Sequence, residues 1–564
     1  MAAFKAKPHP PLPTKDVISW LFDDCPYDAN QAVYYDALDI SRTISFNQAR
    51  TKIRKLVAGL RSLGVRPNEC VLLYSFNDIN YPMLALGIVG AGGIFSGANP
   101  AYTKLELAHH IKATQAKWLF CEPELLATML EAAKDAGLDS ASIKERVLVL
   151  NWLPTQTVPA GFRSWESLMD HGEQDWVKFD DLETCRTTTA LHGTSSGTTG
   201  LPKATVNTHY NVIAQHELVW AQNLSKRPYK PRHLWPLPMF HLAVLPMSFT
   251  TAWKFGHPCY IMRRFDLETY VATIDRQQIT DLLIVPPIAV AVIMSPLVKG
   301  TESSQGKGKY SLRSVKAATV GAAPLTKETQ GRLKKLLSQD PKAAFTQVWG
   351  MTESTCIATN FEYPEDDDTG SIGRLRPGME GKIVDDDGRD ITGYNVVGEL
   401  CLRGPTIIPG YLNNPKANEE SFDRDHFYHT GDIGYVDEKT DKWYLVDRKK
   451  ELIKVRGFQV APPEVEGVLL QHPHIVDAAV IGVREETGLR EGEVPRAWVV
   501  RRPGTQVSEE EVKQWVSSRL ASYKRLDGGV RFVDAIPKNA SGKILKRLLR
   551  EEVKREQRGT GGRL

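Results

Sequence analysis

The segment with the densest polar chemistry in this chain is Thr194-Ser195-Ser196-Gly197-Thr198-Thr199-Gly200-Leu201-Pro202-Lys203, which holds five hydroxyl side chains, two glycines and a lysine in ten residues. Glycine has no Cβ, so its backbone N–H groups can approach a ligand closely. The hydroxyl groups add hydrogen-bond donors, and the lysine adds a positive charge. This combination is typical of a loop that wraps a polyphosphate.

The spacing of this loop differs from that of the P-loop, G-x-x-x-x-G-K-[ST], because Leu201-Pro202 separates the second glycine from the lysine. Apolar and β-branched residues flank the loop at 187–191 and 204–206, which favours a strand–loop–strand hairpin over a strand–loop–helix. Taken alone, a Gly/Ser/Thr decamer is equally compatible with a flexible surface turn.

Six further segments change that balance, because they resemble, in order, the motifs of the acyl-activating, adenylate-forming enzymes. This family includes acyl-CoA synthetases, 4-coumarate–CoA ligases and firefly luciferase, and the resemblance covers essentially the whole chain. The segments are Leu237-Pro238-Met239-Phe240-His241, Gly321-Ala322-Ala323-Pro324-Leu325, Gln347-Val348-Trp349-Gly350-Met351-Thr352-Glu353, Tyr428-His429-Thr430-Gly431-Asp432-Ile433-Gly434, Asp447-Arg448-Lys449-Lys450-Glu451-Leu452-Ile453-Lys454-Val455-Arg456-Gly457-Phe458-Gln459 and Pro537-Lys538-Asn539-Ala540-Ser541-Gly542-Lys543-Ile544-Leu545.

Composition points to a globular enzyme with more than one core. A chain of 564 residues exceeds what one hydrophobic core supports, so several subdomains are expected. The hydrophobic fraction of 42% and charged fraction of 24% are ordinary for soluble enzymes. A net charge of +4 gives no argument for a nucleic-acid or acidic-membrane partner. Seven isolated cysteines without a C-x-x-C pair favour reduced thiols over a zinc site or disulfides.

No targeting or membrane segment is evident, which favours a cytoplasmic protein. Residues 1–14 lack the apolar region of a secretory signal. The longest uncharged apolar run, residues 81–98, is interrupted by glycines and ended by Asn99-Pro100, so it predicts a buried helix turning into a buried strand rather than a membrane span. The final Gly562-Arg563-Leu564 resembles the peroxisomal S-K-L signal only weakly, since Gly562 does not suit it.

Periodicity predicts an α/β fold with two domains. Strand-like runs at 70–75, 118–121 and 146–150 alternate with helical patterns, as in βαβ units and parallel sheets. From Asp447 onward, helix patterns at 463–470 and 508–520 alternate with strands at 476–483 and 496–500. We therefore expect a large, multi-subdomain N-terminal domain (1–446) with sheets flanked by helices, and a small α+β domain (447–564). The resemblance implies that the small domain is mobile about a hinge at Lys450.

The resemblance assigns Lys543, Glu353, Thr352 and His241 to catalysis of the first half-reaction, transfer of AMP from ATP to a carboxylate. Lys543 would contact the α-phosphate and the substrate carboxylate; read alone, it is one more lysine of a basic C-terminal helix. Glu353 would hold Mg²⁺ between ATP phosphates, since a hard cation prefers carboxylate oxygen, and Thr352 would donate to the α-phosphate. Asp432 would accept from both ribose hydroxyls, with Arg448 as a second ribose contact.

The resemblance also assigns residues to ATP, to coenzyme A and to the acyl group. Gln347 and Ala322 would face the adenine and acyl sides, Arg264 would contact the CoA nucleotide, and Arg456-Gly457 would line the pantetheine tunnel. The full set of cofactor-binding residues is Thr194, Ser195, Ser196, Gly197, Thr198, Thr199, Gly200, Lys203, Gly321, Ala322, Gln347, Asp432, Arg448, Lys450, Lys454, Gln459, Arg264, Arg456 and Gly457. The acyl pocket would be formed by His241, Ala243, Met247, Val348 and Trp349.

Three positions depart from the 4-coumarate ligase pattern. Ala243 stands where those enzymes carry a pocket tyrosine, and Val348-Trp349 replaces their Gly-Tyr, which opens one wall and fills the floor. Ala204 replaces the glycine usual after the loop lysine, a change we expect to be tolerated. These departures argue against hydroxycinnamate as the substrate.

Together these features predict an ATP- and Mg²⁺-dependent acid–CoA ligase for an aryl, aryl-alkanoic or medium-chain acid. A stand-alone enzyme loading a carrier-protein thiol, a luciferase-like oxygenase and an inactive nucleotide-binding protein are the alternatives. Arg456-Gly457 fits CoA better than a carrier, and retention of Lys543, Glu353 and Asp432 argues against an inactive protein. The expected partner is a small carboxylic acid, with no nucleic acid, no membrane span and no particular oligomeric state.

Overall fold

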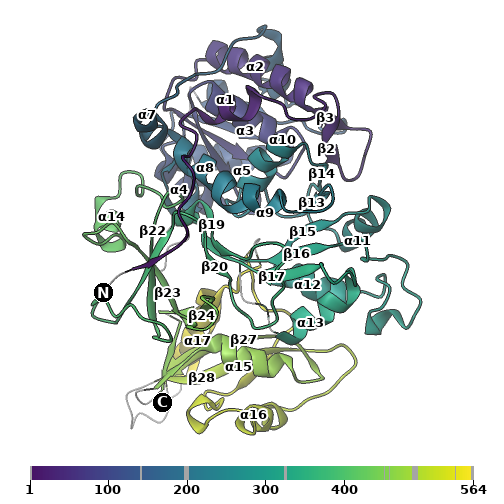
Figure 1. The fold of residues 1–564 in the computed structure, drawn as a ribbon, viewed down its shortest axis with the longest axis vertical. Helices are drawn as coiled ribbons and strands as arrows, with labels where there is room; N and C mark the ends of the chain where they lie inside the picture. Colours follow the sequence, from purple (N-terminus) through teal and green to yellow (C-terminus); the bar gives the residue numbers. More distant parts are fainter. Residues whose placement is uncertain are drawn as a thin grey trace.

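The computed structural model describes residues 3–139, 143–195, 202–322, 325, 327–449, 451–455, 458–484, 493–539 and 542–560, with the backbone alone at 454, 458, 459 and 557–560. Figure 1 shows a large body that carries the N-terminal part of the chain and a smaller lobe, in yellow-green, that carries the C-terminal part. This arrangement confirms the predicted α/β fold with a large N-terminal and a small C-terminal domain.

The first seven-stranded sheet is covered by helices on both faces. In its β4 strand, Val71 and Leu73 pack in the same apolar cluster as helices α2 and α3, whereas Leu72 and Tyr74 pack with α4 and α5. Such a strand reads as a continuous apolar run because neither face meets water. In spatial order the strands are β12 (Asn207–Thr208), β9 (Thr189–Leu191), β5 (Ile94–Ala98), β4 (Cys70–Tyr74), β6 (Trp118–Cys121), β7 (Val147–Val149) and β8 (Arg163–Ser164).

The second seven-stranded sheet has the same character. All its pairings are parallel except the one between its last two strands. Because the carboxyl ends of parallel strands meet at one edge, the segments that follow β15, β16 and β17 lie together. The order is β17 (Ala344–Gln347), β16 (Ala317–Val320), β15 (Asp281–Ile284), β13 (His233–Trp235), β14 (Cys259–Ile261), β2 (Ala32–Asp36) and β3 (Thr43–Ser45).

Helices connect and cover these two sheets, as Figure 1 shows in its upper half. The apolar run at 81–98 forms helix α3 and strand β5, both buried, as predicted. Within the described ranges, no helix is both long and apolar enough to cross a membrane. The main helices are α2 (Phe46–Leu63), α3 (Tyr81–Gly90), α4 (Lys104–Thr114), α5 (Leu126–Asp135), α8 (His209–Gln215), α11 (Leu267–Arg276), α12 (Pro286–Ile293) and α13 (Lys327–Leu336).

A third, antiparallel sheet links the large domain to the small one. Its last two strands pair Asp432 with Arg448, so both of these residues belong to this sheet. The final strand continues through Arg448, two residues beyond the predicted division at 446, which stays a prediction. Because β24 pairs with β23, all of its residues, Asp447 and Arg448 included, are described below with the large domain. The strands are β1 (Phe4–Lys5), β21 (Glu380–Val384), β22 (Gly398–Arg403), β23 (Tyr428–Val436) and β24 (Trp443–Arg448).

The C-terminal domain is a three-stranded sheet between helices. On strand β27, Ala478 and Val480 pack with α15 and α16, while Ala479 and Ile481 pack with α17. This alternation places α17 on the opposite face from the other two helices. The elements are β25 (Ile453–Val455), β26 (Phe458–Val460), α15 (Pro462–Leu470), β27 (Ile475–Arg484), β28 (Glu493–Arg501), α16 (Glu509–Ser517), β29 (Val530–Phe532) and α17 (Lys546–Thr560).

Candidate active site

The hydroxyl-rich segment is carried by a hairpin whose stem is β10 (Thr194–Ser195) and β11 (Lys203–Ala204). The two strands pair antiparallel, Thr194 with Ala204 and Ser195 with Lys203, which confirms the predicted strand–loop–strand form. The carbonyl of Ala204 accepts from the N–H of Leu412 at 2.9 Å. The hairpin stem is therefore fixed against the segment that follows β22.

A close approach at Gly193 brings this hairpin onto the Thr352–Glu353 turn. A Cβ built at Gly193 would lie 2.4 Å from Leu242 Cδ1 and 2.9 Å from Thr352 Cγ2. A side chain at this position would push both neighbours away. Glycine at 193 thus lets the hairpin stem lie beside Thr352, the predicted donor to the α-phosphate, although the two are more than 150 residues apart in sequence.

Glu353 is a buried carboxylate on a single 3₁₀ turn, Thr352–Ser354, after strand β18 (Trp349–Met351). The Tyr411 hydroxyl donates to Glu353 Oε1 at 2.7 Å and lies 3.1 Å from the Tyr428 hydroxyl. Burial, reinforced by the Glu353 charge, raises the pKa of Tyr411, so its hydroxyl keeps its proton and remains a donor.

The same tyrosine ring carries the loop lysine. Lys203 Nζ lies 4.2 Å from the centroid of the Tyr411 ring, within cation–π distance. One side chain therefore contacts both the predicted metal-holding carboxylate and the predicted phosphate-binding lysine. The Lys203 ammonium lies over the ring of Tyr411, and the Glu353 carboxylate lies at its hydroxyl group.

Asp432 is buried on β23 and is held by two donors. Trp349 Nε1 donates to its Oδ2 at 2.8 Å, and Arg448 Nε lies 3.2 Å from its Oδ1. Burial raises the pKa of Asp432, while Arg448 and the Trp349 hydrogen bond oppose that rise. Both oxygens thus point at fixed partners, and the carboxylate is oriented before any ligand arrives.

Lys543 sits at the turn of a small hairpin that leads into α17. Its N–H donates to Asn539 Oδ1 at 2.8 Å, and its carbonyl accepts from the Asn539 N–H at 2.9 Å. A Cβ on Gly542, whose φ is +81°, would lie 2.6 Å from Pro287 Cδ, so the turn packs directly on helix α12 of the large domain.

Lys543 and Asp432, the carboxylate predicted to bind ribose, each affect the pKa of the other. Burial, with a contribution from the Arg448 guanidinium, lowers the pKa of Lys543 to about 8, although Asp432 opposes the change. The ammonium in turn counteracts the burial-driven rise in the Asp432 pKa. Residues of both domains therefore converge here: Lys543 from the small one, Asp432 and Arg448 from the large one.

The predicted acyl-pocket residues lie near the carboxyl ends of the second sheet. His241 Nδ1 accepts from the Ala243 N–H at 3.1 Å, and burial lowers the pKa of His241, so the imidazole is neutral. A Cβ on Gly321 would lie 3.1 Å from Val348 Cγ2, so the valine isopropyl group rests on that glycine. Met247 is fully buried.

Gln347 binds the backbone of a neighbouring segment, and Ala322 has an unusual backbone conformation. The Gln347 amide exchanges two hydrogen bonds with the backbone of Leu325, at 2.9 and 3.1 Å, which pins the segment that begins at Gly321. Ala322 has φ +71°, an uncommon conformation for a non-glycine residue. The contact of Gln347 with adenine stays a prediction.

Arg264 is not assembled with these residues. Arg264 is exposed beyond β14, next to Arg263, which pairs with the fully buried Glu122. Ser196, Gly197, Thr198, Thr199, Gly200, Lys450, Arg456 and Gly457 lie outside the described residues, as do the side chains of Lys454 and Gln459. Their assignments stay predictions.

Two functional contacts were not anticipated from the sequence. Tyr411 was not singled out, because the tyrosine after Pro409-Gly410 carries no periodic or motif signal. Trp349 was assigned only to the acyl pocket, yet its indole N–H binds Asp432. Tyr428 does belong to a quoted motif, and its position four residues before Asp432 could have drawn attention to it.

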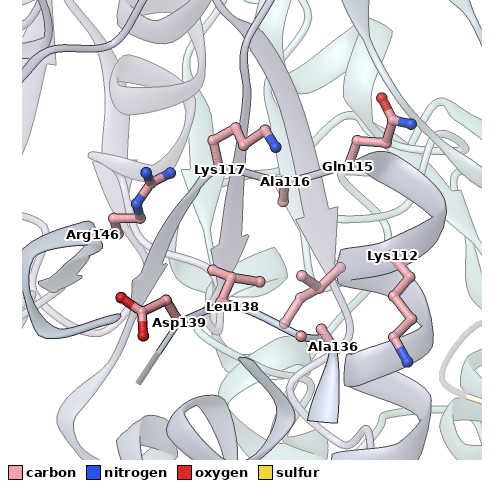
Figure 2. Close-up of a pocket in the computed structure, with 10 residues that line it drawn as sticks. Lys112, Gln115, Ala116, Lys117, Ala136, Leu138, Asp139 and Arg146 are labelled. Atoms are coloured by element: carbon pink, nitrogen blue, oxygen red, sulfur yellow. The ribbon is translucent and has the colours of Figure 1, made fainter. Parts of the chain in front are cut away.

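A cavity of about 480 Å³ lies elsewhere, at the amino ends of β6 and β7 (Figure 2). Its rim carries Lys112, Lys117, Arg146 and Asp139, and it contains none of the predicted site residues. In a parallel α/β sheet, ligands bind at the carboxyl ends of the strands. Glu353 and Trp349, which binds Asp432, follow the carboxyl end of β17 in the second sheet.

A glycine- and hydroxyl-rich hairpin, a buried carboxylate beside it, and a second carboxylate whose charge interacts with that of a lysine from the small domain are the features of an adenylate-forming enzyme. The description "AMP-binding enzyme" matches residues 25–412, and "AMP-binding enzyme C-terminal domain" matches residues 464–543. The chain belongs to the AMP-binding enzyme family.

Relatives and solved structures agree over nearly the full length. Phenylacetyl-CoA ligase epaB of Aspergillus niger is 51% identical and covers 96% of this chain and 97% of its own. Acyl-CoA ligase azaF, also of A. niger, is 51% identical, covering 95% and 98%. ATP-bound MatB of Rhodopseudomonas palustris matches with a TM-score of 0.78 at 25% identity, covering 95% and 98%. This chain is an AMP-forming acid–CoA ligase that works through an acyl-adenylate, with ATP and CoA as substrates.

Proposed function

We propose that this ligase activates an arylacetic acid or a close aryl-alkanoic acid. The observation that carries this proposal is the pocket floor, where Val348 lies on Gly321 and leaves little depth for a long chain. Ala243, in place of an aromatic residue, leaves width at the side wall for an aryl ring. The name of the phenylacetyl-CoA ligase relative, at 51% identity, points to the same class.

The proposed division of labour follows the charges that develop during adenylation. Attack of the substrate carboxylate on the α-phosphate builds negative charge there and releases diphosphate, which needs oriented donors and cations. Lys543 would neutralise that charge, Thr352 would donate to it, and Lys203 with the hairpin would hold the outer phosphates. Asp432, already oriented by Trp349 and Arg448, would accept from the ribose hydroxyls.

Glu353 suits a magnesium ion. It is a buried carboxylate with Oε1 fixed by Tyr411, and hard cations such as Mg²⁺ prefer one or two carboxylates plus phosphate oxygens and water. Such an ion would supply additional positive charge at the ATP phosphates. The contribution of this chain is to hold the carboxylate beside the hairpin and to keep Lys203 over the same phenol.

The second half-reaction, attack of the CoA thiol on the acyl carbon, would use another pose of the small domain. We keep the division of the chain into 1–446 and 447–564, with the pivot at Lys450 and Gly457 at the pantetheine tunnel. Support comes from Gly542, the neighbour of Lys543, which packs against Pro287 of α12 in the present pose, so this face of the small domain is the one turned to the site. The cytoplasmic location also stays a prediction.

The pH dependence of adenylation should report Lys543. Its pKa of about 8 means that the ammonium loses its charge as pH rises through 8, so kcat/KM of adenylation in the free enzyme should fall above that pH. Pyrophosphate–ATP exchange measured from pH 6.5 to 9.5 checks this. In Lys543→Arg the guanidinium stays charged, so the falling limb should disappear; an unchanged limb would assign it to another group.

The pocket floor gives a specificity prediction. Val348→Gly should favour longer acids over phenylacetate by about 10-fold to 200-fold in kcat/KM, the range that one or two methylene groups command in an apolar pocket. Val348→Ala is the matched control, because it removes part of the isopropyl group without adding glycine flexibility, and it should shift selectivity less. Equal selectivity in wild type and Val348→Gly would remove Val348 from the pocket.

The test of the proposed substrate class is a panel of carboxylic acids assayed for ATP-dependent CoA-thioester formation. The panel should include benzoic, phenylacetic, 3-phenylpropionic, 4-coumaric, hexanoic and dicarboxylic acids. We expect phenylacetic acid or a near homologue to have the highest kcat/KM. A preference for 4-coumarate would contradict the pocket argument, while leaving the acid–CoA ligase activity intact.

A further inference from the structure

A buried charge cluster, separate from the site above, lies where the two domains join. Lys546, the first residue of α17, is 7% exposed, and its Nζ lies 3.1 Å from Glu451 Oε2 and 3.3 Å from Glu466 Oε1. The charge of Asp447 also acts on this ammonium, and its buried Oδ2 has no hydrogen-bond partner among the described residues. Three carboxyl groups therefore share one lysine.

Each carboxyl group comes from a different part of the chain. Asp447 is on β24 of the large domain, Glu466 is on α15 of the small domain, and Glu451 follows the predicted pivot at Lys450. Glu466 is itself fixed, because its Oε1 accepts from the Val480 N–H at 2.8 Å. Lys546 thus connects the large domain, the pivot and the small domain through a single charge.

Lys449, which precedes the predicted pivot, is held by the large domain instead. Lys449 Nζ lies 3.2 Å from Glu399 Oε2, and the Lys449 N–H donates to the Gly431 carbonyl at 2.8 Å; both partners belong to the third sheet. Lys449 is therefore tied to the large domain, while Glu451 is tied to α17 of the small one. The Glu451 N–H also donates to the Arg448 carbonyl at 2.8 Å, so its backbone keeps a contact with β24.

Lys546 is also joined to the hairpin that carries Lys543. The Leu545 N–H donates to the Pro537 carbonyl at 2.8 Å and closes the base of that hairpin, one residue before Lys546. A displacement of Lys546 would move the base of the hairpin and, with it, the Lys543 ammonium. A shift of about 1 Å at a reacting group can cost on the order of 10²-fold in rate.

We propose that Lys546 is a positioning residue for adenylation, whose ammonium holds the Lys543 hairpin to Glu451 and Glu466 and draws it toward Asp447 on the large domain. This inference rests on the proposed function, in which Lys543 serves the first half-reaction and a second pose serves the other. The ties to Glu451 and Glu466 can travel with the small domain. The attraction to Asp447 exists only when the small domain lies as it does here.

The chemistry of the cluster fits such a role. Burial alone would lower the pKa of Lys546, but Glu466 and Glu451 outweigh it and raise that pKa, so the side chain is a fixed cation. Burial raises the pKa of Asp447 to about 7, although Lys546 opposes the rise. Buried ion pairs are poor sources of stability, yet they can specify one arrangement over another.

The experiment compares the two half-reactions in Lys546→Met and in Arg547→Met. Arg547 is the matched control, because it is the next residue, carries the same charge and pairs with Glu551 on the exposed surface of α17. We expect Lys546→Met to slow pyrophosphate–ATP exchange by about 10-fold to 100-fold. Thiolation of a supplied acyl-adenylate should stay within about 3-fold of wild type, well below the loss in exchange. Arg547→Met should match wild type in both steps.

Loss of folding is separated from loss of positioning by a second variant. Lys546→Met leaves carboxylates unpaired, so Lys546→Met/Glu466→Met, which removes one of them with the lysine, should regain thermal stability without regaining exchange activity. Recovery of exchange together with stability would overturn the positioning role, as would equal slowing of both half-reactions in Lys546→Met. Failure of the wild-type enzyme to form an acyl-adenylate from any acid would instead overturn the proposed function, and this inference with it.

Discussion

Lys543→Ala is expected to slow formation of the acyl-adenylate by about 10²-fold to 10³-fold, the loss typical of removing one preorganised electrostatic donor. The ammonium lies at the meeting point of the two domains, close enough to Arg448 and Asp432 for their charges to affect its pKa. Negative charge on the α-phosphate would go uncompensated without it. Pyrophosphate–ATP exchange with a saturating acid measures this step alone.

The same variant should retain thiolation of a supplied acyl-adenylate, since that step is assigned to another face of the small domain. Lys554→Ala, which removes an exposed lysine from the same α17, is the control for a change in charge alone and should leave both steps unchanged. An equal loss in both half-reactions of Lys543→Ala would contradict the two-pose mechanism, even for an enzyme that still makes CoA thioesters.

Glu353→Gln is expected to lower adenylation by about 10²-fold and to raise the Mg²⁺ concentration needed for half-maximal activity. Glutamine keeps the size of the side chain and can still accept from the Tyr411 hydroxyl, so the change removes charge rather than packing. Titrating Mg²⁺ against the exchange rate gives the measurement.

Tyr411→Phe is the companion variant, because it removes the hydroxyl that orients Glu353 but leaves the carboxylate and the ring under Lys203. We expect a smaller loss of rate than in Glu353→Gln. A Mg²⁺ requirement that is the same in wild type and in Glu353→Gln would show that the carboxylate is not the metal ligand.

The elements of the fold could be predicted from local sequence where both faces of a strand are buried. The runs that form β4, β6 and β7 are apolar without alternation and are punctuated by helical segments, which is how parallel sheets read. The hairpin stem at 194–204 could also be predicted, because β-branched residues flank a loop rich in glycine. Both signals lie within a few residues of the feature they predict.

The contacts that orient the site could not be predicted in this way. Tyr411 and Glu353 are 58 residues apart, and Trp349 and Asp432 are 83 apart. Such pairs meet only after three sheets have assembled, so no local pattern encodes them. The charge cluster around Lys546 is similar: its lysine reads as part of a basic helix until the helix is seen to begin in a pocket of carboxylates.

Trp349 differs from the other predicted pocket residues in how freely it can be replaced. Its indole N–H donates to Asp432, while its neighbour Val348, between β17 and β18, lies against Gly321. If the proposed acyl pocket and ribose contact are correct, substitutions at 348 or 243 should change the space for the acid without disturbing Asp432. A substitution at Trp349 would change the pocket and also remove the hydrogen bond to Asp432. We therefore expect acid selectivity to change through positions 348 and 243, while Trp349 is retained.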